Sequence, residues 1–224
     1  RSTLFPYTTL FRSKVTARLA APVHRWGFLC EYIYNFQPDG SFRLDFSAKL
    51  QDAGLELPPL QCVGFEMTLP VTVTKAAWFG LGPGEAYPDS KEAQKVGYYK
   101  LPVEALSTNY TYPQENGNRH EVRRAAFYDD KMCGILVSGA PLFDFSAHHY
   151  TAQALEEAKH PHEIEYCDEL VLNLNWKSAP LGSNSCGPLP EDKLLIKPGD
   201  FKFSMNFRGF AGAELDDKTF FTMI

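Results

Sequence analysis

Hydrophobic and polar residues alternate with a period of two over several short stretches of the chain. Residues 26–36 place an apolar side chain at every second position, and residues 37–40, Gln-Pro-Asp-Gly, are typical of a turn. The alternation then resumes, which predicts a β-hairpin. Residues 63–69, 170–174 and 201–207 repeat the pattern and predict half-buried antiparallel strands. The apolar positions are Phe28, Cys30, Tyr32, Tyr34 and Phe36, then Phe42, Leu44 and Phe46, then Val63, Phe65, Met67 and Leu69, then Leu170, Leu172 and Leu174, and last Phe201, Phe203, Met205 and Phe207.

A helix is predicted only for residues 151–159, TAQALEEAK, whose composition favours it. Thr151 is suited to the N-cap position, and Pro161 ends the helix because the residue before a proline avoids helical geometry. Many short strands, frequent turn signals and no strand-helix alternation indicate an all-β fold. We therefore predict an antiparallel β-sandwich with one short helix.

Composition and charge narrow the classes of protein. The chain has 224 residues, of which 44% are hydrophobic, enough for one good-sized domain or two small ones. With 22 Lys and Arg against 27 Asp and Glu, it lacks the basic footprint of a nucleic-acid-binding protein. Its longest apolar runs span only a few residues, so no membrane segment is predicted. Five dispersed cysteines, without a Cys-x-x-Cys pair or a secretory leader, favour a reduced, cytoplasmic protein.

Acidic residues are the first candidates for chemistry. A glycosidase needs two carboxylates that face each other across the scissile bond, and Glu85, Asp89, Glu115 and Glu121 are of the required type. Their spacing does not pair any two of them. Solvated acids at strand ends and turns are the favoured interpretation.

Histidines and a glycine-rich stretch are the other candidates. His148 and His149, with a second group at residues 160–163, have metal-ligating chemistry, but Pro161 breaks any common helical face, and no metal site is predicted. The glycines of residues 80–84 lack the Lys-Ser/Thr of a phosphate-binding loop, and a tight turn is expected there. Judged by spacing alone, the sandwich has no self-contained active site.

Asn116 and Gly117 form a dipeptide that predicts a two-residue hairpin, across whose ends Glu115 and Arg119 could pair. The three aromatic residues Trp78, Phe79 and Tyr87 are interpreted as core residues with polar tips.

Five ordered motifs carry a resemblance to a known family. Together they resemble the C-terminal domain, the small-chain or fifth domain, of the large family-2 β-galactosidases of the lactase type, over residues 43–207. The motifs are WFGLGPGEAYPDSK at residues 78–91, PQENGNR at 113–119, PLFDFS at 141–146, HPHE at 160–163 and LGSNSCGP at 181–188.

The resemblance implies a supersandwich of the galactose-mutarotase type that packs beside other domains. In that family a TIM barrel carries both catalytic glutamates of a retaining mechanism, so no catalytic residue is expected in this chain. The substrate would be a terminal β-D-galactoside such as lactose. Family members are often tetrameric and use Mg²⁺ together with Na⁺ or K⁺, which are bound mainly by other domains. The expected partners are therefore the upstream barrel and sandwich domains and further copies of the chain.

The chain divides into three parts under this interpretation. Residues 1–13, RSTLFPYTTLFRS, resemble the translation of a common sequencing adapter and are set apart from the fold. Residues 14–210 correspond to the sandwich domain, which would lack its first strands. Residues 211–224 form a tail whose status the sequence leaves open.

One loop of the domain reaches the active site in the family. Cys186 stands at the position of an aromatic Trp that lies against the leaving group in the well-known bacterial member, and Asn184 and Ser185 precede it. The resemblance implies that these three residues contact substrate. Because Cys is much smaller than Trp, a roomier leaving-group site is expected. The alternative is that residues 182–188 form a tight turn in which Cys186 fills a gap.

A second function remains open at this point, namely a stand-alone carbohydrate-binding or mutarotase-like sandwich. A mutarotase needs a histidine and a carboxylate that converge in one cleft. The adapter-like start favours the β-galactosidase fragment, because it accounts for a missing barrel.

Overall fold

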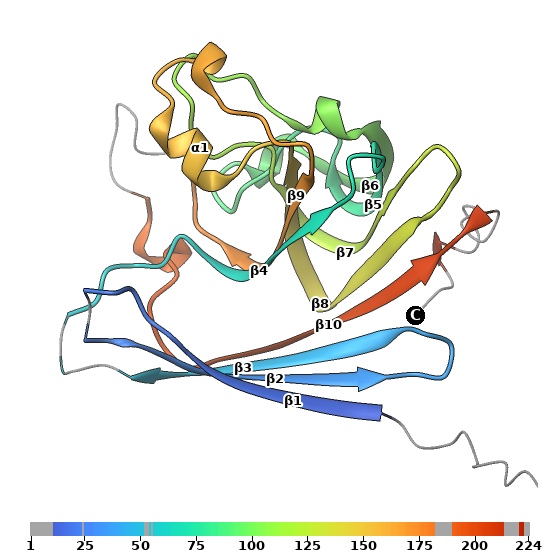
Figure 1. The fold of residues 1–224 in the computed structure, drawn as a ribbon. Coiled ribbons are helices and arrows are strands. Elements are labelled where there is room, and N and C mark those ends of the chain that lie inside the picture. Colours follow the sequence, from blue (N-terminus) through green and yellow to red (C-terminus); the bar gives the residue numbers. More distant parts are fainter. Residues whose placement is uncertain are drawn as a thin grey trace, which may run out of the picture.

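The computed structural model describes residues 11–23, 25–51, 54, 56–181, 190–212 and 220–221. In this part of the chain, an antiparallel ten-stranded sheet is bent so that two layers face each other (Figure 1). One short α-helix, α1 (Ala152–Glu157), lies beside the upper layer. The strands are β1 (Phe11–Leu19), β2 (Gly27–Phe36), β3 (Phe42–Gln51), β4 (Cys62–Leu69), β5 (Lys75–Gly82), β6 (Lys95–Pro102), β7 (Arg119–Tyr128), β8 (Gly134–His148), β9 (Leu170–Ser178) and β10 (Phe201–Phe210), and the short 3₁₀ turns are η1 (Lys91–Ala93), η2 (Val103–Leu106), η3 (Pro161–Glu163) and η4 (Asp192–Leu194).

Strand β8 belongs to both layers. The main path of the sheet runs β1-β2-β3-β10-β8-β7-β5-β6, while β9 pairs with β8 and β4 pairs with β9. Residues 134–139 of β8 lie beside β10, whereas residues 144–148 lie beside β9. This change of partner along one strand places β4 and β9 over β2, β3 and β10 (Figure 1).

Aromatic side chains fill the space between the layers. The Phe65 ring of β4 lies 5.5 Å from Phe46 of β3 and 5.3 Å from Phe203 of β10, measured between ring centroids. Trp176 of β9 stacks on the same Phe203 ring at 5.5 Å. The predicted alternation therefore places its apolar face inside, and the predicted antiparallel all-β sandwich is confirmed. Helix α1 also begins where predicted, because the Thr151 hydroxyl oxygen accepts a hydrogen bond from the Ala154 N–H at 3.1 Å.

The predicted tight turn at residues 80–84 is wrong for residues 80–82, whereas the chain does bend at residues 83–84. Gly80 and Gly82 belong to β5, where they allow neighbours to approach closely. A Cβ atom on Gly80 would lie 2.8 Å from the Cα of Val122, and one on Gly82 would lie 2.7 Å from a ring carbon of Tyr99. The glycines serve packing here, as close approach of a backbone requires.

Two chain segments at the predicted domain borders make contacts in the fold. Strand β1 begins at Phe11, inside the adapter-like segment, and Phe11 pairs with Phe36. At the other end, Phe220 is buried against Tyr98, with a centroid distance of 4.8 Å. The origin of residues 1–13 and the status of the tail stay predictions. Among the described residues, no helix has the length and apolar character to span a membrane.

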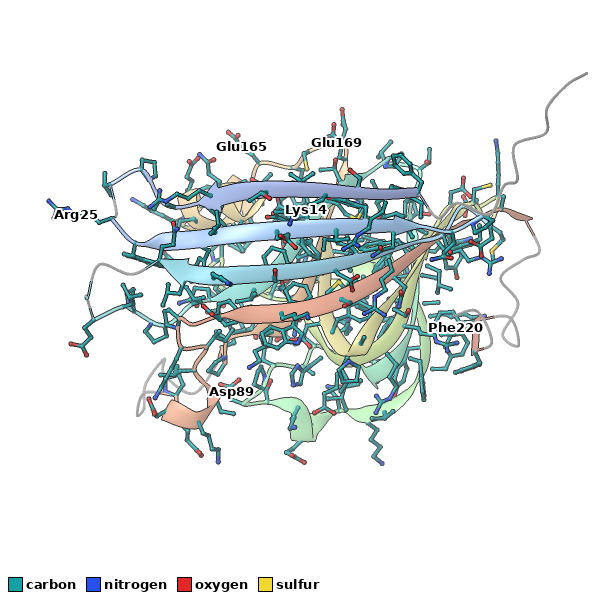
Figure 2. The ribbon with its side chains drawn as sticks, turned by 90° about the horizontal axis from the view of Figure 1, so that it is seen from below. Lys14, Arg25, Asp89, Glu165, Glu169 and Phe220 are labelled. Carbon is teal, nitrogen blue, oxygen red and sulfur yellow. The ribbon has the colours of Figure 1, made fainter. Side chains whose placement is uncertain are left out.

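Strand β1 leaves apolar surface uncovered at the edge of the sheet. Val15 and Leu19 are 46% and 62% exposed, although they pair with Tyr32 and Phe28 and thus lie on the core-facing side of the sheet. Lys14 lies on the opposite, outer face, which Figure 2 shows from below. Among the described residues, β1 pairs only with β2, so one side of β1 offers unpaired backbone groups. Such an edge is a template for association.

We expect the substitution Val15→Lys to reduce self-association of the purified chain, because it puts a charge on this uncovered apolar face. Light scattering at matched protein concentrations measures the effect. Thr16→Lys is the control, since it adds the same charge on the outer face of the same strand. Equal scattering by the two variants would show that the apolar face does not drive association.

Candidate functional site

The three predicted substrate-contacting residues, Asn184, Ser185 and Cys186, lie outside the described residues. The structure describes the approach to their loop. Strand β9 leads to Ala179, whose N–H donates to the Gln61 carbonyl at 2.7 Å, and the Leu181 N–H donates to the Asp89 carboxylate at 3.1 Å. The start of the loop is therefore fixed at a defined place on the sandwich.

A cleft of about 490 Å³, with a polar floor and partly apolar walls, opens beside this place. Its floor is the outward face of β4, β9 and β8, where Glu66 pairs with Asn173 and Asn173 pairs with Ser146. These three residues form one row across three strands. Because side chains alternate along a strand, the row points away from the aromatic core. The remaining lining comes from Tyr87, residues 113–115, α1 and the segment that ends at Leu181.

Glu115 and Tyr87 form one wall of the cleft. The Tyr87 side chain, only 2% exposed, donates its hydroxyl hydrogen to Glu115 Oε1 at 3.3 Å. Water reaches Glu115, yet the surrounding walls limit its hydration, and this desolvation raises its pKa. The Tyr87 hydrogen bond lowers the pKa, and the negative charge of Glu85 raises it further. Cys62, across the cleft, also has a raised pKa through desolvation and the charges of Glu115 and Glu66.

A network of buried and half-buried polar groups lies next to this wall. Glu85 accepts hydrogen bonds from the Gly117 N–H at 2.8 Å and from the Tyr110 hydroxyl, and burial together with this bond raises the pKa of Tyr110 to about 12. Arg119, 2% exposed, donates to the carbonyls of Leu106 and Gly117. Its guanidinium carbon lies 5.2 Å from the ring centroid of Trp78.

Two sequence predictions fail in this network. Burial lowers the pKa of Arg119 to about 10. Its hydrogen bonds go to two carbonyls, and it forms no ion pair with Glu115. Asn116 and Gly117 do not join two strands, because they lie between η2 and β7. The Asn116 side chain accepts a hydrogen bond from the Thr108 N–H and donates one to the Gln114 carbonyl. Trp78 and Tyr87 are core residues as predicted, whereas Phe79 is only partly buried.

His148 is held in the same region by two contacts. Its Nδ1 lies 3.1 Å from the Ser107 hydroxyl, and its Nε2 lies 3.1 Å from the Asn116 carbonyl. Burial lowers the pKa of His148 to about 4, so the ring is neutral at pH 7 and donates from Nε2 to the carbonyl. His160, by contrast, is exposed and caps η3 together with Glu163.

The two other candidate acids also have protein partners. Asp89 holds the start of the loop at Leu181, and Glu121 forms an ion pair with Lys91 at 2.8 Å. No group of three or more His, Cys, Asp and Glu side chains in the described part of the chain is arranged to hold a metal ion.

The fold and this site define a class of protein, namely an antiparallel β-sandwich domain that carries a polar cleft at the start of a loop. A family model described as the β-galactosidase small chain matches residues 6–207. The chain therefore belongs to the β-galactosidase small-chain family.

Curated relatives agree with this assignment. The chain is 32% identical to a β-galactosidase of Vibrio cholerae over 202 residues, 90% of this chain and 19% of that protein. It is 36% identical to one of Arthrobacter sp. over 141 residues, 61% of this chain and 14% of that protein. A third, from Pseudoalteromonas haloplanktis, is 29% identical over 181 residues, 80% of this chain and 16% of that protein. The chain thus spans less than a fifth of the length of these relatives.

Among solved structures, a GalM/aldose epimerase homologue from C. elegans aligns with 90% of this chain and 66% of its own. The TM-score is 0.45 and the identity is 8%.

The raised pKa of Glu115 predicts a pH-dependent stability effect. Below about pH 4 the carboxyl is protonated in both the folded and unfolded chain. As the pH rises through the raised folded pKa, ionisation is less favourable in the folded than in the unfolded chain, so this carboxyl's contribution to stability is lost. The effect is small, because the Glu115 side chain is exposed and solvent screens its charge. The glutamine side chain of the Glu115→Gln variant has no carboxyl proton to lose. We therefore expect its free energy of unfolding, relative to the original chain, to increase between pH 4 and pH 7.

Urea unfolding at both pH values measures this difference. The control is Glu165→Gln, which removes an exposed carboxyl on another surface (Figure 2). A Glu115→Gln effect that is the same at pH 4 and pH 7 would contradict the desolvation of Glu115.

Proposed function

We propose that this chain is the C-terminal part of a β-galactosidase that hydrolyses terminal β-D-galactose residues, as in lactose. The observation that carries the proposal is the family match over residues 6–207 in a chain that spans 19% of its Vibrio cholerae relative. A retaining glycosidase uses one carboxylic acid as acid and base and one carboxylate as nucleophile. In our proposal both belong to a barrel domain outside this chain.

The proposed contribution of this chain to catalysis is the loop that contains Cys186. Asn184, Ser185 and Cys186 would contact the leaving-group side of the substrate, while other domains bind the galactosyl unit. The anchoring of Leu181 by Asp89, beside a polar cleft, supports a defined position for the loop. A small thiol at residue 186 leaves room where an aromatic ring would stack on glucose.

We further propose a cytoplasmic, homo-oligomeric enzyme of lactose catabolism. The four cysteines within the described residues, Cys30, Cys62, Cys133 and Cys167, are free thiols, which suits a reducing compartment. Mg²⁺ and Na⁺ or K⁺ would be bound mainly by the other domains of the enzyme.

The alternative is a stand-alone carbohydrate-binding or mutarotase-like sandwich, and the presence of a polar cleft within the chain favours it. A mutarotase needs a histidine that exchanges protons at neutral pH. His148, whose pKa is lowered to about 4 and whose nitrogens both have partners, is poorly suited to that task. The upstream genomic sequence separates the two functions, because a barrel in frame fits only the β-galactosidase.

The isolated chain should hydrolyse no galactoside, since the proposal places both carboxylates in another domain. Purified chain and a chromogenic β-galactoside should give only the rate of buffer, with the complete enzyme as the positive control. Turnover that disappears in Glu85→Gln or Glu115→Gln would contradict the proposal, because those acids would then belong to an active site in this chain.

Cys186→Trp in the complete enzyme should tighten glucose inhibition while galactose inhibition stays the same. A stacked aromatic ring contributes about 1 kcal/mol, which corresponds to a roughly fivefold lower inhibition constant. The ratio of the glucose and galactose inhibition constants is the measurement, since loss of active enzyme does not change it. Cys133→Trp, at an exposed cysteine between β7 and β8, is the matched control. A ratio unchanged by Cys186→Trp in folded enzyme would make the loop purely structural.

A further inference from the structure

The outward face of β9 and β8 differs from an ordinary solvated sheet face, because Ser146 is buried and Asn173 and Asn175 are half-buried, whereas Glu66 on β4 is exposed. Such faces usually carry charged side chains in open contact with water. Here Asn173 and Asn175 lie side by side on β9, with Ser146 on one side and Glu66 on the other. Helix α1, with Leu155 and its neighbours, and the wall of Tyr87 and Glu115 enclose them, so that the row lies at the bottom of a cleft.

The two amides have hydrogen-bonding capacity beyond their protein contacts. Asn173 donates to the Ser146 hydroxyl at 3.4 Å, and Asn175 donates to the Ser178 hydroxyl at 3.4 Å. Both distances are at the long limit for a hydrogen bond. A carboxamide can donate two hydrogen bonds and accept two, so each of these contacts uses one of four positions.

The charge of the cleft restricts the ligand. Its described lining contains three carboxylates, Glu66, Glu115 and Glu156, and contains no Lys, Arg or His. A phosphate, a sulfated sugar or any other anion would be repelled. The volume of about 490 Å³ lies within the usual range for small-molecule sites. A neutral ligand with many hydroxyl groups fits best, because each hydroxyl both donates and accepts and can bridge an amide and a carboxylate.

The cleft also presents apolar surface that suits a sugar ring. Pro113, Pro180 and Leu181 line the cleft together with the polar row. A pyranose ring has C–H groups as well as hydroxyls, and ligand sites of this kind combine apolar contact with a few fixed polar groups. Leu181 is also the residue that directly precedes residues 182–189, which lie outside the described residues.

We propose that this cleft is a saccharide subsite, in which Asn173, Asn175 and Glu66 bind a neutral hexopyranosyl unit. Only the identity of the sugar, a unit of a galactoside substrate or product, rests on the proposed β-galactosidase function. Binding itself requires no catalytic carboxylate, and therefore it can be measured on this chain without turnover.

The test is titration of the full chain with lactose, followed by ligand-observed NMR. The original chain should bind lactose, and Asn173→Ala should weaken binding about fivefold, the equivalent of one lost hydrogen bond. Asn206→Ala is a closely matched control, because Asn206 donates to the Ser138 hydroxyl at the same 3.4 Å on β10, outside this cleft. That variant should bind lactose as the original chain does.

Glu66→Ala is a second variant, which removes an exposed side chain of the same row. It should also weaken binding several-fold, and urea unfolding of each variant confirms that it is folded. Absence of lactose binding by the folded original chain, or equal affinity in Asn173→Ala, Glu66→Ala and Asn206→Ala, would overturn the subsite. Hydrolysis of a chromogenic galactoside by the complete enzyme tests the proposed function separately, so the two can fail independently.

Discussion

Aromatic packing between the two layers is the interaction on which the rest of the structure depends. Phe203 of β10 touches Phe46 in its own layer, while Phe65 and Trp176 reach it from the opposite layer. Burial of such rings supplies most of the free energy that holds two sheets together. The same contacts fix the position of β4 and β9 relative to the opposite layer. They thereby also fix the position of the outward face, on which the polar row lies.

The second constraint is the burial of Arg119. A buried guanidinium is costly unless its N–H groups have partners. Here the carbonyls of Leu106 and Gly117 accept hydrogen bonds from Nη1 and the face of Trp78 lies against the guanidinium, while the buried Nε has no hydrogen-bond partner among the described residues. These contacts tie η2 and the segment before β7 to the core. Glu85 strengthens the tie through the Gly117 N–H. Glu115 precedes Gly117 by only two residues. The contacts of Arg119 and Glu85 therefore also fix the position of the cleft wall.

Alternation of apolar residues was sufficient to predict β2, β3, β4, β9 and β10, because in each strand the apolar positions face the core and the intervening positions face away from it. It could not predict β5, since nearly all residues of Lys75–Gly82 are buried and no alternation exists. In β7 the register shifts around Val122, which breaks the period of two. In β8 Pro141 lies inside the strand, where a proline normally argues against one.

The candidate site was predictable only in part for a similar reason. Motif resemblance indicated the loop around Cys186, because a resemblance depends on local sequence. The cleft combines Glu66, Tyr87, Glu115, Ser146 and Asn173, which come from distant parts of the chain. Only the strand register brings them together. The spacing of the acids along the sequence carried no information about the cleft. The polar positions of β9 did indicate which face of that strand points outward.

The shared strand β8 has a consequence for how the domain opens. Residues 144–148 lie in the floor layer of the cleft and residues 134–139 lie beside β10, within one continuous strand. Separation of β9 from β8 therefore disturbs the strand that also holds the lower layer, so the cleft and the core belong to one cooperative unit rather than to two foldons. Amide hydrogens in these two halves of β8 would then exchange with solvent through a common opening, with similar free energies.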